Sequence, residues 1–151
     1  MRKKLTSSLT SDQLLHLLFT AKILNEKVDS ATVYDLAQQL RKKDSSASNL
    51  ANILLIVTSL KLEKSVLETF LPDVKALLEQ ADEADGIYLY YDKGVYTTSM
   101  AIDGIFQLAA ALGKSPVMSE VIIKYANSFS MLHTFFYDIH ILRYVWLEKY
   151  I

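Results

Sequence analysis

The chain has no cysteine, so it can form no disulfide, no thiolate nucleophile and no cysteine-based zinc or iron–sulfur site. Glycine and proline are also scarce, with four and two residues in a chain of 151. That is too few for an all-β protein built on tight turns. Apolar residues, in contrast, make up 51 % of the sequence. The composition therefore predicts a folded, helical domain.

No excess of one charge is present. Sixteen basic and seventeen acidic residues give a formal net charge of −1. Binding to nucleic acid usually depends on a clustered basic surface, so we expect no nucleic-acid partner.

Targeting and membrane segments are not expected either. Residues 2–4 are basic, as at the start of a signal peptide, but residues 5–12 are mostly polar where an apolar stretch should follow. The longest aliphatic run, from Ile53 to Val57, is far shorter than the roughly 20 residues that span a bilayer. The sequence predicts neither a signal peptide nor a transmembrane segment in this chain.

Apolar residues recur with a helical period along most of the chain. Thr10 and Gln13 have the spacing of a capping box, Asp29 or Ser30 can cap a second helix, and Pro72 suits a first helical turn. Thr97 or Thr98 is predicted to cap a helix that Gly113 closes. The expected helices cover about 11–25, 30–43, 50–60, 64–70, 72–84, 98–112, 115–129 and 131–149.

We therefore predict an all-α fold of antiparallel helical hairpins, arranged as in an α/α toroid or solenoid. A short extended or hairpin segment near 86–94 is expected as well, because it alternates briefly between glycines. Residues 1–151 are expected to form a single helical domain.

Residues that could carry chemistry are few. The acidic group Glu79, Asp82, Glu83 and Asp85 is expected at a solvated helix end. His16 is expected to be a packing or boundary residue, and His133 and His140 share a helix face without the further ligands that a metal site needs. No phosphate-binding loop or nucleophile elbow occurs. The sequence predicts no catalytic residue, no cofactor-binding residue and no metal ligand.

Aromatic residues are concentrated in two places. Four tyrosines, at 88, 90, 91 and 96, crowd the glycine-bounded segment, and most of the others fall in 129–150. Tyrosine is favoured both in cores and at interfaces. For the tyrosine segment both interpretations stay open, whereas part of the 131–149 helix is expected to meet something outside the chain.

The tyrosine segment also carries a resemblance. A glycine, an aromatic–Leu pair, a second aromatic, another glycine and a Thr-Thr pair follow one another between residues 86 and 98. This order is similar to that in the lumenal helical domain of the ribophorin II family, which is an accessory subunit of the oligosaccharyltransferase. The similarity extends over about 10–130. The residues that carry it, which also form a possible interface, are Gly86, Tyr88, Leu89, Tyr91, Gly94, Thr97 and Thr98.

The resemblance implies a non-catalytic structural or assembly role in protein N-glycosylation, at the lumenal side of the endoplasmic reticulum membrane. It implies other oligosaccharyltransferase subunits as partners and no cofactor. Family members also have a signal peptide, β-rich domains and membrane helices. The chain is therefore expected to be a fragment of a larger protein, with membrane contact only through segments outside it or through partner subunits.

Two other hypotheses remain. A soluble helical-hairpin adaptor that binds a partner protein would explain the aromatic surface. An α/α-toroid enzyme is the weaker one, because it would need Asp82 or His133 to act and the sequence offers no accompanying base or nucleophile.

Overall fold

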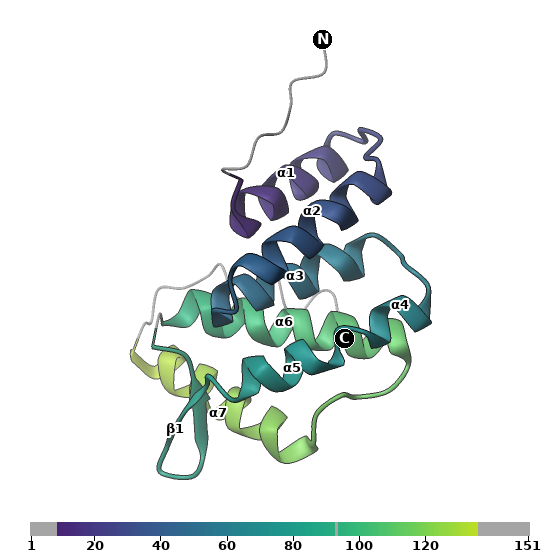
Figure 1. Cartoon of the computed structure of the whole chain (residues 1–151). Coiled ribbons are helices and arrows are strands. Elements are labelled where there is room, and N and C mark those ends of the chain that lie inside the picture. Colours follow the sequence, from purple (N-terminus) through teal and green to yellow (C-terminus); the bar gives the residue numbers. More distant parts are fainter. Residues whose placement is uncertain (1–8, 93, 136–151) are drawn as a thin grey trace.

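The computed structural model describes residues 9–92 and 94–130, together with the backbone of 131–135. Its described part is mostly helical, with one short antiparallel hairpin, which confirms the predicted fold class (Figure 1). In chain order the elements are α1 (Ser11–Ile23), α2 (Ser30–Lys43), α3 (Ala47–Ser59), α4 (Lys64–Glu68), α5 (Leu71–Leu78), β1 (Asp82–Ala84), β2 (Tyr88–Tyr90), α6 (Val95–Leu112) and α7 (Ser119–Phe135).

The first two helices begin where the sequence predicts. The Thr10 hydroxyl accepts the Gln13 backbone N–H at 3.2 Å, and the Gln13 side chain accepts that of Thr10 at 3.1 Å. This reciprocal pair is the predicted capping box. The Asp29 carboxylate accepts the Ala31 N–H at 3.2 Å, so Asp29 caps α2. Together α1 and α2 form an antiparallel hairpin (Figure 1).

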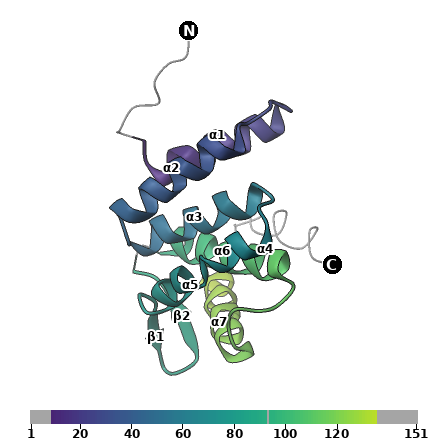
Figure 2. The ribbon, with the colours of Figure 1, turned by 45° about the vertical axis from the view of Figure 1, so that its right-hand side comes forward.

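Helix α3 is the centre of the domain. Figures 1 and 2 both place it between the α1–α2 hairpin and α6. Every residue of α3 from Asn49 to Val57 is buried, which explains why its apolar face is too wide for a surface helix. Close packing on α6 depends on Gly104, where an added Cβ would lie 3.0 Å from the Leu54 Cβ and 3.2 Å from the Ala51 carbonyl oxygen.

A salt bridge joins α2 to α5. The Arg41 Nε donates to Asp73 Oδ1 at 2.8 Å, and its Nη2 donates to the Thr69 carbonyl at 3.0 Å. The guanidinium also lies 4.6 Å from the centre of the Phe70 ring, a cation–π contact. Asp73 is only 7 % exposed, so its charge depends on this partner.

Predicted boundaries are wrong in three helices, α5, α6 and α7. Helix α5 ends at Leu78 instead of 84, and residues 82–84 form β1. Of the acidic group, Asp82, Glu83 and Asp85 therefore lie on the hairpin, and only Glu79 lies at a helix end, as the C-cap of α5. Helix α6 begins at Val95 after Gly94, so Thr97 and Thr98 lie inside its first turn and do not cap it. Helix α7 begins at Ser119 and not at about 115, and it runs without a break to Phe135, where a new helix was expected from 131.

Other signals held. Pro72 lies in the first turn of α5, and Gly113 closes α6 with a left-handed φ of 73°. The expected contacts of the aromatic side chains of the 131–149 segment, and the side chains of His133 and His140, lie outside the described residues.

Candidate interaction site

The family-like segment begins in the turn of the hairpin. Strands β1 and β2 pair antiparallel with Glu83 opposite Leu89. Between them Asp85 and Gly86 both have positive φ, 53° and 70°. Glycine adopts this conformation freely and aspartate tolerates it, so Asp-Gly is a favoured pair for such a turn. The segment between the glycines is thus the second strand of a hairpin whose first strand lies upstream.

Tyr91 anchors the end of the hairpin in the core. Only 1 % of it is exposed. Its hydroxyl donates to the Leu77 carbonyl at the end of α5, at 3.0 Å, and lies 2.8 Å from the Tyr125 hydroxyl on α7. Because the single proton of Tyr91 goes to Leu77, Tyr125 must donate to Tyr91. One side chain therefore fixes the hairpin to two helices.

Burial raises the pKa of the Tyr91 phenol far above its ordinary value, and the neighbouring Tyr125 raises it further. Burial likewise raises the pKa of the Tyr125 phenol. Both phenols are consequently neutral at physiological pH. The pair provides packing and hydrogen bonds, not an acid or a base.

Thr98 links the hairpin to α6. Its hydroxyl accepts the Tyr91 backbone N–H at 3.1 Å and donates to the Gly94 carbonyl at 3.0 Å. The Gly94 N–H in turn donates to the Tyr91 carbonyl at 2.8 Å. Gly94 has φ 83° and ψ −160°, a backbone conformation open essentially to glycine alone. The glycine and the threonine thus form one connected turn.

Helix α7 holds β2 from its other side. The Ser128 hydroxyl donates to the Leu89 carbonyl at 2.6 Å, and the Asn127 side chain donates to the Ile87 carbonyl at 3.0 Å. Lys124 forms salt bridges with Glu83 at 3.1 Å and Glu120 at 3.2 Å. Hydrogen bonds to these two carboxylates raise the pKa of the Lys124 ammonium.

Most of the family-like residues are therefore internal. Leu89, Tyr91, Thr97 and Thr98 are buried, Tyr88 is half-buried, and only the two glycines are exposed. The outward-facing side chains of the segment are others: Ile87 is 48 % exposed, Tyr90 40 % and Tyr96 54 %. The tyrosine segment thus divides between core and surface.

The sequence analysis did not identify the α7 residues that contact the hairpin. Tyr125 and Ser128 contact the hairpin from 34 and 39 residues away, so no local pattern relates them to it. Their spacing of three residues on one helix face was the available signal.

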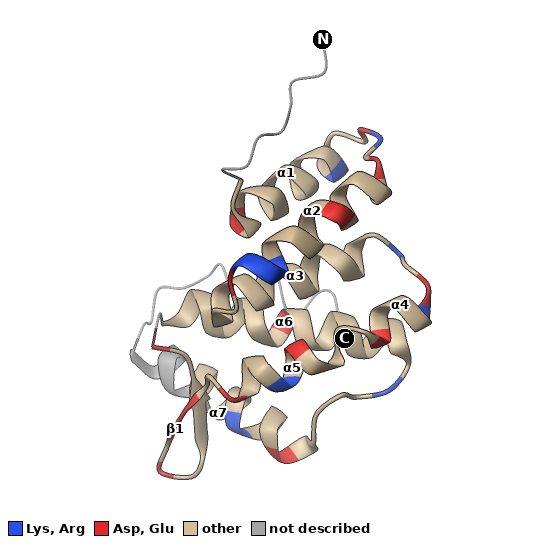
Figure 3. Ribbon diagram, viewed as in Figure 1, with Lys and Arg blue, Asp and Glu red and all other residues tan. Residues whose placement is uncertain are grey.

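The described residues around the hairpin offer few groups suited to acid–base chemistry or metal binding. No group of three His, Cys, Asp or Glu side chains suited to a metal ion occurs among the residues that the structure describes. His16 is exposed on α1, where its Nδ1 lies 2.8 Å from the Asp12 carbonyl; it does not pack in the core as predicted. In Figure 3 acidic residues mark the β1 side of the hairpin, and basic residues mark the end of α2.

Comparison with known proteins gives one positive finding. The family model described as "Ribophorin II N-terminal domain" matches residues 1–136. No curated protein and no solved structure matches the chain. The matched range contains every described element and the whole hairpin arrangement. The chain therefore belongs to the ribophorin II N-terminal domain family, whose context is the oligosaccharyltransferase complex.

Proposed function

We propose that this chain is a non-catalytic structural or assembly domain of the oligosaccharyltransferase complex, acting in protein N-glycosylation at the lumenal side of the endoplasmic reticulum membrane. The observation that carries the proposal is the family match over residues 1–136. The internal use of the family-like residues supports it, because Tyr91 and Thr98 hold the hairpin against α5 and α6. Other subunits of the complex are the proposed partners.

The exposed edge of the hairpin is the proposed contact surface. Ile87 and Tyr90 project from it, while the residues around them hold the backbone in place. Aromatic side chains on a rigid support bind partners at a low cost in conformational entropy. Gly86, Tyr88, Leu89, Tyr91, Gly94, Thr97 and Thr98 would then act by shaping this edge.

The test is co-purification. The chain, carrying a tag and an added secretory leader, is expressed in cells, and microsomes are dissolved in a mild detergent. We expect the tagged protein to bring down activity that glycosylates an Asn-containing acceptor peptide. The double variant Ile87→Ser/Tyr90→Ser should lose this activity without losing its fold. Lys61→Ser, an exposed change away from the hairpin, is the matched control.

If the wild-type chain is folded and lumenal yet brings down no transferase activity, the proposal is wrong. The adaptor hypothesis would then lead. It is favoured by the apolar end of the α1–α2 hairpin, where Ile23 is 79 % and Leu24 65 % exposed. Finding the native protein in the cytosol would support that alternative.

A further inference from the structure

The buried contacts of α1 are confined to its beginning. Of its 13 residues only Ser11, Leu14 and Leu15 are buried, and all three lie within the first five positions. None of the residues after Leu15 in this helix is buried, and residues 22–32 are all exposed. Figure 2 shows this end of α1, with the turn into α2, at the periphery of the domain. Helix α1 is therefore attached to the rest of the domain at one end.

Few polar contacts join α1 to later elements. Within the described part of the chain there are two such hydrogen bonds and no salt bridge. The Asn52 side chain on α3 donates to the Ser11 hydroxyl at 3.3 Å, which is long for an N–H···O bond. The Tyr96 hydroxyl at the start of α6 donates to the Asp12 carboxylate at 3.1 Å, at the surface. The polar attachment of α1 is consequently weak.

Helix α2 is attached more firmly, although few of its residues are buried. Arg41 near its end forms the salt bridge with Asp73 on α5. The Tyr34 ring packs edge-on against Phe70 of the core, with the ring centroids 6.5 Å apart. Helix α1, in contrast, packs mainly on α3 and only slightly on α2. Because of this difference, α1 can leave the domain without carrying α2 along.

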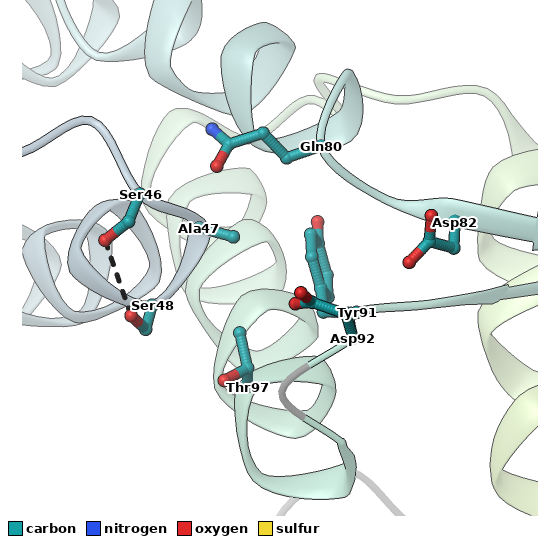
Figure 4. A pocket seen from close by; sticks show the side chains of 8 residues that line it. All are labelled: Ser46, Ala47, Ser48, Gln80, Asp82, Tyr91, Asp92 and Thr97. Atoms are coloured by element: carbon teal, nitrogen blue, oxygen red, sulfur yellow. Dashed lines mark hydrogen bonds between the residues drawn. The ribbon is translucent and has the colours of Figure 1, made fainter.

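Helix α3 has other support besides α1. Helix α6 packs closely on its opposite side, and the Gln80 side chain donates to the Ser45 carbonyl just before it at 2.9 Å. At the start of α3, Ala47 lines an open pocket of about 340 Å³ together with Tyr91 of the hairpin and Thr97 of α6 (Figure 4). The start of α3 is thus held next to the hairpin and α6 by groups that do not involve α1.

The surface between α1 and α3 contains a buried amide that is incompletely satisfied. Asn52 is 4 % exposed, and its side-chain oxygen has no hydrogen-bond partner within the described structure. A buried carbonyl without a partner is costly, and water would supply a partner once α1 moves away. Hydration of Asn52 therefore offsets part of the cost of uncovering Leu14 and Leu15.

We propose that α1 separates from α3 while the elements from α2 to α7 stay folded. In this local opening the exposed turn at 24–29 acts as the hinge, and the side of α3 that carries Asn52 becomes accessible. The opening requires less free energy than global unfolding, because Leu14 and Leu15 are the only buried apolar side chains of α1 that leave the core. It involves neither the hairpin edge nor a partner, and so does not depend on the proposed function.

The test is hydrogen exchange of backbone amides in the full 151-residue chain, followed by NMR at urea concentrations below the unfolding transition. A detached helix of 13 residues is marginally stable in water, so its amides exchange when it leaves. We expect Leu18 and Ala21 on α1 to exchange about tenfold or more faster than Ala37 on α2 and Ile105 on α6. Their exchange should also depend less on urea, because the local opening exposes less surface.

Two variants test the cause of the opening. Tyr96→Phe removes the surface hydrogen bond to Asp12 and should speed exchange in α1 about threefold, whereas the matched control Tyr90→Phe should leave it unchanged. The double variant Ser11→Ala/Asn52→Leu replaces the incompletely satisfied pair by apolar side chains. It should slow exchange in α1 without changing exchange in α6.

Equal exchange rates and urea dependences in α1 and α6 would overturn the inference, and so would exchange of α2 together with α1. Unchanged exchange of α1 in both Tyr96→Phe and the double variant would overturn it as well. Thermal melts establish that each variant is folded. Should the double variant not fold, the wild-type and Tyr96→Phe measurements still decide.

Discussion

The Tyr91–Tyr125 pair makes stability depend on pH in a defined direction. In the unfolded chain a tyrosine loses its proton near pH 10, whereas burial raises both pKa values in the folded protein. The folded state therefore keeps protons that the unfolded state releases. The stability contributed by the pair is complete below about pH 10 and is lost as the pH rises further.

We predict that the free energy of unfolding falls above about pH 10 by up to 1.4 kcal/mol per pH unit for each phenol that stays protonated. Urea unfolding at several pH values measures this slope. The variant Tyr91→Phe/Tyr125→Phe should have a flatter profile, although it is less stable at neutral pH. Exposed Tyr90→Phe should keep the wild-type profile. Identical slopes in all three proteins would contradict the prediction.

Arg41 is expected to be the most sensitive charged position. Arg41→Gln leaves the Asp73 carboxylate buried without its cation, and we expect a loss of about 2–4 kcal/mol in unfolding free energy. The double variant Arg41→Met/Asp73→Leu, which removes both charges, should recover most of the lost unfolding free energy. Lys75→Gln removes an exposed pair with Glu79 and should cost under about 0.5 kcal/mol. An Arg41→Gln loss as small as that would refute this account.

Residue-level prediction succeeded at several positions where the signal is local, although the local signal at Thr97 and Thr98 misplaced the start of α6. The Thr10–Gln13 box, the Asp29 cap and the Gly113 terminus depend on neighbours within a few positions, and each was predicted. Arg41 differs, because its salt bridge is not local. Its actual partner, Asp73, is 32 positions away, which a local pattern does not reveal.

At the scale of elements, the hairpin shows tertiary contacts overriding helix propensity. Residues 79–84 are mostly good helix formers, so the sequence predicts a helix through 84. Instead, Glu83 pairs with Lys124 on α7 and residues 82–84 pair with β2. These contacts come from later parts of the chain. The second strand of the hairpin was therefore placed at the right residues, but the first strand was missed.

The packing of α3 on α6 gives a prediction at this scale. Gly104→Val would place side-chain atoms against the Ala51 carbonyl and Leu54, in the most buried helix of the domain. We expect a loss of about 2–3 kcal/mol from overpacking, measured by urea unfolding. Ala110→Val makes a comparable change at an exposed position of the same helix and should cost much less. Equal losses would show that helix propensity, and not packing, decides the effect.

For the molecule as a whole, α6 raises the question of whether the domain can enter a membrane. By length and composition alone α6 is apolar enough to cross a bilayer, which the predicted absence of such a segment did not anticipate. Its buried face packs on α3, with Ala101 completely enclosed. Leaving the bundle would expose the apolar face of α3, at about 25 cal/mol for each Å². The domain is therefore expected to keep α6 in its core.

Because the chain has no cysteine, the burial of α6 can be tested by introducing and labelling a single cysteine. In Ala101→Cys the thiol should resist a water-soluble maleimide until urea unfolds the protein, whereas in exposed Ala110→Cys it should react at once. Adding phospholipid vesicles should change neither rate, because α6 stays packed on α3. If α6 entered the bilayer instead, the Ala110→Cys thiol would become protected on adding vesicles. That protection would show that the domain gives up its core to bind a membrane.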